Sequence, residues 1–246
     1  MTNKEFIDKL LNIVNNYNTV YAYGTFGQKV TNSIISQKTK QYPNWYTTNR
    51  INSLKKLVGK NYFCFDCVGL IKGVLWGWNG SNNTNGGAKY ESNGVPDVNA
   101  NGLINKCSNI SSNFSNIELG EILWMNGHVG VYYKNNQVIE CSSAFKNKVQ
   151  ITNLSDRKWV KHGKLPWITY NTSSNFLPSR GYFKKGDSGK NVEKICEFLS
   201  NFVKGDYFGD YAVSCTKVFQ KQNGLEPDGN IGPLTLKKME EKGFKY

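Results

Sequence analysis

The chain has 246 residues, 39% of them hydrophobic, which is enough for one medium-sized and one small domain, each with its own core. Its 31 Lys and Arg outnumber its 18 Asp and Glu, giving a formal net charge of +13. This charge favours an anionic polymer as partner, although it can also be a solubility feature of a lysine-rich proteome. Nearly all basic residues are lysines, which disfavours sequence-specific nucleic-acid recognition, and no apolar run is long enough to span a bilayer.

The first residues predict an amphipathic helix, with Phe6, Leu10, Leu11 and Val14 on one side. The segment has no uninterrupted apolar core and no small-residue cleavage site, so it does not resemble a signal peptide. We therefore expect a chain made in the cytoplasm, whose action outside the cell would need another route of release.

The pattern that follows predicts a mixed α+β domain, with helices first and then an antiparallel sheet. Residues 19–26 alternate like a short strand, and residues 31–60 predict one or two helices. Residues 79–101 are rich in Gly and Asn, which predicts a long surface loop. Strand-like runs then occupy residues 121–125, 128–133, 137–141 and 148–151.

The last part of the chain has a different pattern. Residues 171–175 are polar and lack periodicity, so we expect a first domain at residues 1–170, a linker at 171–180 and a second domain at 181–246. Helical patterns around residues 192–199, 213–219 and 234–239 are separated by glycine-containing turns. They predict a small all-α domain of three helices.

The main chemical clue is a cysteine at the expected start of a helix, followed much later by a histidine at the start of a strand-like run. Asp66 is a natural N-cap, so Cys67 lies in the first helical turn, where the helix macrodipole favours the thiolate. His128 begins the run at 128–133. A nucleophilic cysteine with a histidine base is the minimum that hydrolysis of an amide bond requires.

A second interpretation rests on Cys64 and Cys67, which form a Cys-x-x-Cys pair of the kind seen in redox and zinc proteins. A zinc site would need more ligands, and the chain has only two histidines and no second such pair. We therefore expect no metal and no cofactor. We place the other histidine, His162, in a surface loop, and expect most of the six cysteines to be buried free thiols.

Two known families resemble parts of this chain. Residues 19–170 resemble the NlpC-type cell-wall cysteine peptidases, a papain-like group that cleaves amide bonds in peptidoglycan stem peptides. The resemblance rests on Tyr-Ala-Tyr-Gly at 21–24, Phe-Asp-Cys-Val-Gly-Leu at 65–70, Gly-His-Val-Gly-Val-Tyr at 127–132 and Val-Ile-Glu-Cys at 138–141. Residues 181–246 resemble the peptidoglycan-binding module found beside such enzymes, through Gly-Asp-Ser-Gly at 186–189, Asn-Gly-Leu at 223–225 and Ile-Gly at 231–232.

The first resemblance implies a papain-like fold with a catalytic triad. Cys67 would be the nucleophile, His128 the base, and Glu140 the residue that orients the imidazole. Family members often have His, Asn or Gln at this third position, and the glutamate is similar to the Cys-His-Glu arrangement of the CHAP amidases. The backbone N–H of Cys67 would meet the oxyanion.

Three further residues are assigned to substrate binding. The resemblance implies that Tyr21 lies near Cys67 and shapes the subsite, although a half-buried strand tyrosine is an equally good interpretation. Asp66 and Trp124 are the other two residues assigned to substrate binding. Trp124 can also be interpreted as a residue of the core or of the groove wall. The chain departs from the family in the long segment between Gly27 and Cys67, which we expect to build part of the groove wall.

A test of the triad lies in the hairpin between the second and third of the four strand-like runs. Side chains alternate between the two faces of a strand, so the length of the connecting loop decides which residues share a face. A two-residue turn would direct Glu140 away from His128. A three-residue loop at 134–136 would pair Tyr133 with Gln137 and Gly130 with Glu140, and would place both side chains on one face. We predict the three-residue loop.

These observations predict a peptidoglycan hydrolase of the endopeptidase or N-acetylmuramoyl-L-alanine amidase type, such as a phage or prophage endolysin. The expected partner is a Gram-positive wall with its anionic polymers, reached through a holin-like pore. A conjugation- or bacteriocin-associated wall hydrolase is a further possibility. The alternatives are a wall-binding protein with an inactive peptidase fold and a thiol or zinc protein that uses Cys64 and Cys67.

Overall fold

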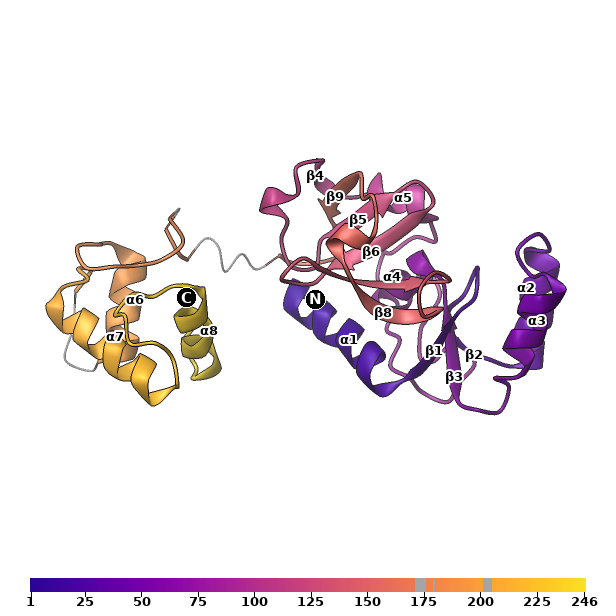
Figure 1. The fold of residues 1–246 in the computed structure, drawn as a ribbon, viewed down its shortest axis with the longest axis horizontal. Helices are drawn as coiled ribbons and strands as arrows, with labels where there is room; N and C mark the ends of the chain where they lie inside the picture. Colours follow the sequence, from indigo (N-terminus) through magenta and orange to yellow (C-terminus); the bar gives the residue numbers. More distant parts are fainter. Residues whose placement is uncertain (171–175, 179, 201–204) are drawn as a thin grey trace. The chain divides into compact units, whose positions relative to one another are not determined.

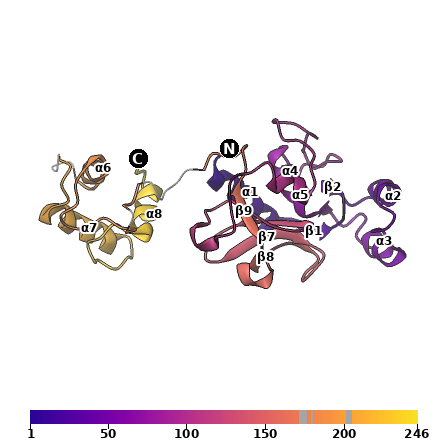
Figure 2. The ribbon, with the colours of Figure 1, turned by 90° about the horizontal axis from the view of Figure 1, so that it is seen from above.

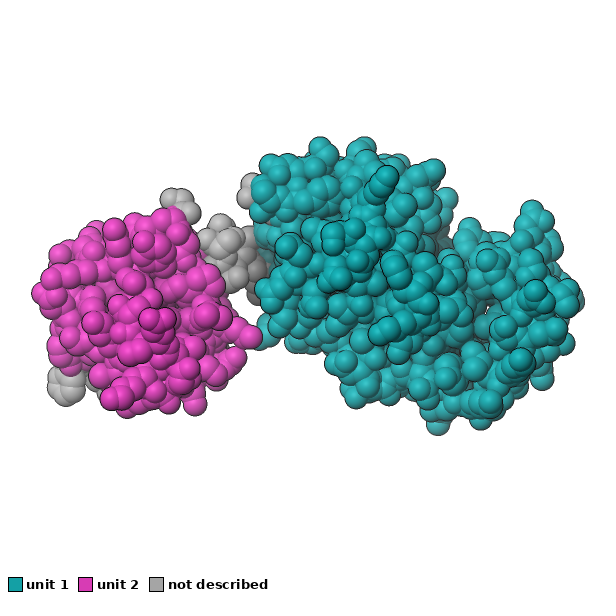
Figure 3. Space-filling view, in the orientation of Figure 1, with its two compact units in different colours: residues 1–171 teal, residues 172–246 magenta. Residues whose placement is uncertain are grey.

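The computed structural model describes residues 1–170, 176–178, 180–200 and 205–246. The chain divides into two compact units, residues 1–171 and 172–246 (Figure 3). Most of the first half of the expected linker, residues 171–175, and residue 179 lie outside the described residues. Phe176 is buried and packs against Phe183 in the core of the second unit. Phe176 thus belongs to the core of the second unit although it falls within the expected linker, and the expected bounds of 171–180 stay a prediction.

The first half of unit 1 combines helices with a small sheet (Figure 1). Its strands have the order β1-β3-β2, with β1 parallel and β2 antiparallel to β3. The sequence did not reveal this sheet, because each strand has four residues and shows little alternation. The elements are α1 (Asn3–Asn16), β1 (Asn18–Tyr21), β2 (Phe26–Lys29), α2 (Asn32–Gln41), α3 (Thr48–Lys55), β3 (Tyr62–Phe65) and α4 (Cys67–Leu75).

Helix α4 lies at the centre of unit 1, and all of its residues are buried. The sequence pattern had suggested a single apolar face, but the helix is covered on every side. Two glycines allow this close packing: a Cβ atom at Gly69 would lie 1.9 Å from the carbonyl oxygen of Thr25, and one at Gly73 would lie 2.4 Å from that of Phe26. Side chains at these positions would push α4 away from β2 and displace its first residue.

The second half of unit 1 is a six-stranded antiparallel sheet with the order β4-β9-β5-β6-β7-β8. Four of its strands, β5 to β8, match the four strand-like runs, and together with the helices they confirm the mixed α+β class. The elements are α5 (Ala100–Ile104), β4 (Ser108–Ser111), β5 (Ile122–Met125), β6 (His128–Tyr132), β7 (Gln137–Ser142), β8 (Lys148–Asn153) and β9 (Lys161–Lys164), with 3-10 turns at Phe114–Asn116 and Leu154–Asp156.

Strand β9 corrects one expectation. His162 was placed in a surface loop, but it is 4% exposed and its Nδ1 is bonded to the carboxylate of Glu121. Its Nε2 lies 2.9 Å from the carbonyl oxygen of Asn113. Strand β9 could not be recognised in the sequence, because lysines at both of its ends give it a polar composition although His162 and Gly163 between them are buried.

The second unit contains three helices in its described residues, as the sequence predicts, and they surround an apolar core. A buried Gln220 ties the turns together: its Nε2 donates to Asp228 at 2.7 Å, and its Oε1 accepts from the N–H of Gly229 at 2.9 Å. None of the described helices of the chain combines the length and the apolar character that crossing a bilayer requires. The helices are α6 (Lys190–Leu199), α7 (Asp210–Gln222) and α8 (Pro233–Glu241).

Candidate active site

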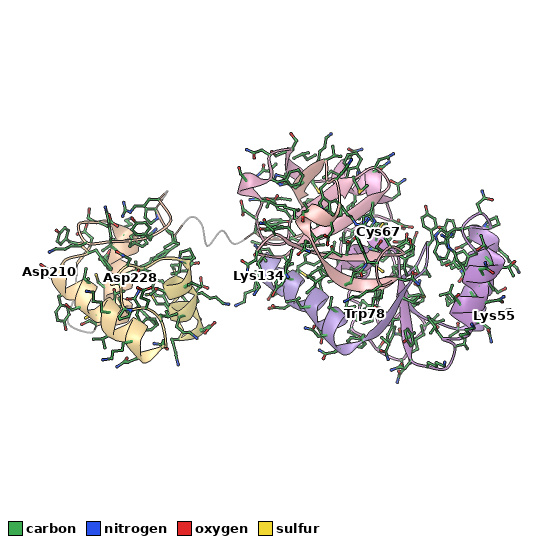
Figure 4. All side chains as sticks on the ribbon, viewed as in Figure 1. Lys55, Cys67, Trp78, Lys134, Asp210 and Asp228 are labelled. Carbon is green, nitrogen blue, oxygen red and sulfur yellow. The ribbon has the colours of Figure 1, made fainter. Side chains whose placement is uncertain are left out.

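Cys67 is the first residue of α4 and directly follows β3 and the N-cap Asp66 (Figure 4). The two carboxylate oxygens of Asp66 accept from backbone N–H groups, Oδ1 from Gly69 at 2.6 Å and Oδ2 from Gly24 at 2.8 Å. The N-cap expectation is confirmed. Asp66 is 6% exposed, and its hydrogen bonds fix the start of the helix and the preceding turn, while its expected role in substrate binding stays a prediction.

The thiol of Cys67 lies beside the beginning of β6. The backbone N–H of Val129 is hydrogen-bonded to the Cys67 sulfur. That N–H is outside the ladder between β6 and β7, whose paired residues are Val131 with Ile139 and Tyr132 with Val138. Cys67 therefore occupies the place where these two strands separate, next to the backbone of His128.

The electrostatic environment of Cys67 differs from the sequence-based expectation of a favoured thiolate. Burial, followed by the charge of Asp66, raises the pKa of Cys67 to about 12. The N–H groups of Val129, Val68 and Cys67 itself lower it, as the helix start predicts, but they do not outweigh burial. In the free protein Cys67 is therefore a neutral thiol that needs a base.

A histidine and a glutamate form the second part of the site. His128 Nε2 lies 2.6 Å from Glu140 Oε2, and the Glu140 side chain is fully buried. The hairpin has the predicted three-residue loop: the N–H of Tyr133 donates to Gln137 at 2.9 Å, and the register continues through Val131 and Ile139. This even register places His128 and Glu140 on one face of the sheet.

Glu140 also has two partners that the sequence did not indicate. Thr152 donates to Oε1 at 2.7 Å, and Nε of Arg157 donates to Oε2 at 2.7 Å while its Nη2 reaches Ser142. Burial alone would raise the pKa of Glu140, but the hydrogen bonds from His128 and Thr152 and the charges of His128 and Arg157 outweigh it and lower the pKa. Glu140 is therefore an ionised carboxylate that can hold an imidazolium.

Two further residues restrain His128. The ring of Trp159 stacks on the imidazole, with centroids 5.6 Å apart and planes at 20°. Oδ1 of Asn101 accepts from the N–H of Gly127, at 2.9 Å, and from Nε1 of Trp124, at 3.0 Å. Asn101 thus supports the turn before His128. Neither residue could be assigned from sequence, because each reaches the site from a distant segment.

The structure places the remaining expected residues as follows. Tyr21 ends β1 and is paired with Phe65 of β3, two residues before Cys67. Burial is the main cause that raises the pKa of Tyr21. Trp124 is half-buried on β5, opposite Val129 in the sheet, and packs against the core. Cys64 is 2% exposed, and its thiol donates to the carbonyl oxygen of Gln28 at 3.2 Å.

One expected contact is missing. Among the described residues, no hydrogen bond joins the Cys67 thiol to His128. Catalytic hydrogen bonds are often loose before substrate binds and tighten in the complex. The described part of the chain also has no group of three or more His, Cys, Asp or Glu side chains placed to hold a metal ion.

Comparisons with known proteins support the second unit. Residues 188–239 match the family model of a peptidoglycan binding domain. No curated protein matches the chain. Among solved structures, a periplasmic domain of the EpsAB fusion protein of the Vibrio vulnificus type II secretion system is 14% identical, with a TM-score of 0.24. The match covers 53% of this chain and 61% of that chain, and a likeness this weak assigns neither fold nor function.

The match places a peptidoglycan-binding domain in the second unit, which suggests association with the cell wall and supports peptidoglycan as a partner.

Proposed function

We propose that the chain is a peptidoglycan hydrolase that cleaves an amide bond of the stem peptide with Cys67 as nucleophile. The observation that carries the proposal is the pairing of His128 with the buried Glu140, 2.6 Å apart, in the same unit as a cysteine at a helix start. A histidine held by a carboxylate is the arrangement that activates a neighbouring thiol. The peptidoglycan-binding domain in the same chain indicates peptidoglycan as the substrate. We also propose that the first unit is related to the papain-like NlpC peptidases that residues 19–170 resemble.

The reaction begins with a neutral thiol. The Cys67 proton passes to the ring nitrogen of His128 that does not face Glu140, and the sulfur attacks the carbonyl carbon of the amide. Glu140 stabilises the imidazolium, and backbone N–H groups at the start of α4 receive the oxyanion. The C–N bond breaks as His128 returns the proton to the leaving amine. Water then hydrolyses the thioester and regenerates the thiol.

The proposed substrate is a Gram-positive wall, because its anionic polymers would attract the basic chain. Of the 31 Lys and Arg, 19 lie in residues 1–175, which contain only nine of the 18 Asp and Glu. The positive field would raise the concentration of the enzyme at such a wall. A lytic enzyme of the endolysin or autolysin type fits this combination of charge, cysteine site and wall-binding domain.

The test measures new amino groups and clearing of turbidity on purified Gram-positive peptidoglycan. We expect activity from the wild type, none from Cys67→Ala, and nearly full activity from Cys64→Ser, which alters a buried cysteine three residues away that has no role in the reaction. Product masses would name the bond that is cut. Equal activity of the wild type and Cys67→Ala would overturn the proposal.

A wall-binding protein without catalysis is the second candidate function. Burial raises the pKa of Cys67 to about 12, and no hydrogen bond links its thiol to His128 in the described structure, so the site at rest lacks a preformed ion pair. Wall binding by both proteins, without release of amino groups by the wild type, would favour this candidate.

A further inference from the structure

Three aromatic side chains gather on the part of unit 1 that precedes the nucleophile. Tyr23, Tyr42 and Trp45, called here the aromatic platform, come from the turn after β1 and from the connection between α2 and α3. The rings of Tyr23 and Trp45 are nearly parallel, at 27° with centroids 6.4 Å apart, and Tyr42 meets Tyr23 edge-on at 5.0 Å. Figure 2 shows α2 and α3 side by side beyond the strands of the small sheet.

The platform is continuous with the candidate active site through Tyr21. The rings of Tyr21 and Trp45 have centroids 5.7 Å apart. Tyr21 is also the partner of Phe65 in the pairing of β1 with β3, two residues before Cys67. The aromatic side chains of the platform therefore connect, through Tyr21, to the strand that leads into the nucleophile.

The platform is held in place by the same turn that supports the nucleophile. Tyr46 is buried, and its hydroxyl donates to the carbonyl oxygen of Tyr23 at 2.8 Å. Gly24, with φ of +76°, packs so closely on Tyr42 that a Cβ atom there would lie 2.2 Å from the ring. The N–H of Gly24 donates to the Asp66 carboxylate that caps α4. The rings and the thiol are thus positioned together before any ligand arrives.

Two of these rings remain open to solvent. Tyr23 is 42% exposed and Tyr42 is 36% exposed, whereas Trp45 is half-buried and carries the guanidinium of Arg50 at 4.5 Å from its ring centroid. Adjacent exposed aromatic side chains next to a reactive group indicate a ligand-binding surface. Lys38 Nζ lies 5.8 Å from the centroid of the Tyr42 ring, so one of the two exposed tyrosine side chains has a cation beside it.

We propose that the aromatic platform binds a sugar ring of the glycan strand that carries the stem peptide. A pyranose ring has an apolar face of C–H groups and a rim of hydroxyls, which matches the apolar face and polar rim of a tyrosine. The peptidoglycan-binding domain in the same chain supports the glycan strand of peptidoglycan as the ligand. The inference rests on the proposed function, and it adds that the scissile amide lies close to the glycan.

Binding is tested separately from catalysis in the full chain with Cys67→Ala. All six tryptophans lie in residues 1–171, so tryptophan fluorescence reports on unit 1 and not on the peptidoglycan-binding domain. The probe is the disaccharide of N-acetylglucosamine and N-acetylmuramic acid. We expect a saturable change, weakened about tenfold (about 1.4 kcal/mol) by Tyr23→Ala or Tyr42→Ala, because each substitution removes one ring on which the sugar would stack.

Tyr90→Ala is the matched control, because Tyr90 is 53% exposed and lies outside the platform. We expect it to leave binding of the disaccharide unchanged. No saturable change in the parent protein would overturn the inference. Equal affinity of the parent, Tyr23→Ala and Tyr42→Ala would also overturn it.

A second arm uses the active protein on a stem peptide with and without the attached disaccharide. The wild type should prefer the sugar-bearing substrate, and Tyr23→Ala should lower kcat/KM about tenfold for that substrate alone. An equal loss on both substrates would contradict a sugar subsite. If the wild type hydrolyses neither substrate, the proposed function fails, while the fluorescence titration still decides whether the platform binds sugar.

Discussion

Glu140 is the residue on which the candidate site depends most, because three side chains meet at its buried carboxylate. His128 and Arg157 both donate to Oε2, and Thr152 donates to Oε1. A charge buried this deeply is tolerated only when it is paired and hydrogen-bonded. The carboxylate therefore both stabilises the fold and orients the imidazole.

The first prediction concerns acid stability. The pKa of Glu140 is lowered in the folded protein, so its ionised form stabilises the fold above the unfolded pKa of about 4.3. This contribution disappears as the pH falls through the folded pKa. At pH 7 we expect Glu140→Gln to lower the free energy of unfolding by about 1.5–3 kcal/mol. In urea unfolding the gap should shrink towards pH 3, and a gap independent of pH would contradict the assignment.

Arg157 allows a second prediction at this scale. Its guanidinium bridges Glu140 and Ser142, a geometry that lysine cannot reproduce. We expect Arg157→Gln to reduce kcat at least tenfold with little change in KM, because Glu140, which orients His128, loses the donor that fixes its carboxylate. Arg157→Lys should recover only part of this loss. Lys158→Gln is the control at an exposed neighbour, and an equal effect of the two glutamine variants would refute the role.

At the scale of elements, the hairpin between β6 and β7 decides whether the site exists. Its loop residues Asn135 and Asn136 have positive φ, at 49° and 57°, which asparagine tolerates well. Deleting Asn136 would leave a two-residue turn and move Glu140 to the opposite face. We expect this deletion to abolish hydrolysis with native-like far-ultraviolet circular dichroism. Asn136→Gly keeps the loop length and should remain active, and activity in the deletion variant would contradict the register argument.

Local signals in the sequence were sufficient for the features that depend on neighbours along the chain. Asp66 as the N-cap follows from a short-range rule, whereas the loop at 134–136 was predicted from the triad that the family resemblance implies, and both are confirmed. Arg157 and His162 depend on partners from distant strands, and no spacing reveals those pairings. The pKa of Cys67 shows the same limit, because the helix start is visible in the sequence but the burial that outweighs it is not.

At the scale of the whole molecule, the two units have separate cores, and the proposed function assigns catalysis to the first and wall binding to the second. The second unit carries the peptidoglycan-binding domain, and the candidate active site lies entirely in the first. Tethering an enzyme to its polymer raises the effective concentration of substrate without adding a contact to the active site. The basic first unit would also be attracted to an anionic wall, and salt would weaken that attraction.

Removing the second unit therefore has a specific expected effect. A chain ending at residue 171 should hydrolyse intact walls about 100-fold more slowly, yet retain the rate of the full chain on a soluble stem-peptide fragment. Its remaining activity on walls should fall as salt is raised. The comparison of insoluble and soluble substrates is its own control. Equal losses on both substrates would mean that the second unit supports the fold of the first.

The most direct test of the central claim is a search for the covalent intermediate. A stem-peptide substrate is mixed with the wild type, quenched with acid within milliseconds to seconds, and examined by intact mass and peptide mapping. We predict an added acyl group on Cys67 that is absent from Cys67→Ala and accumulates when water attack is slowed. Hydrolysis that proceeds with no adduct on Cys67, and at the same rate in Cys67→Ala, would contradict the proposed nucleophile.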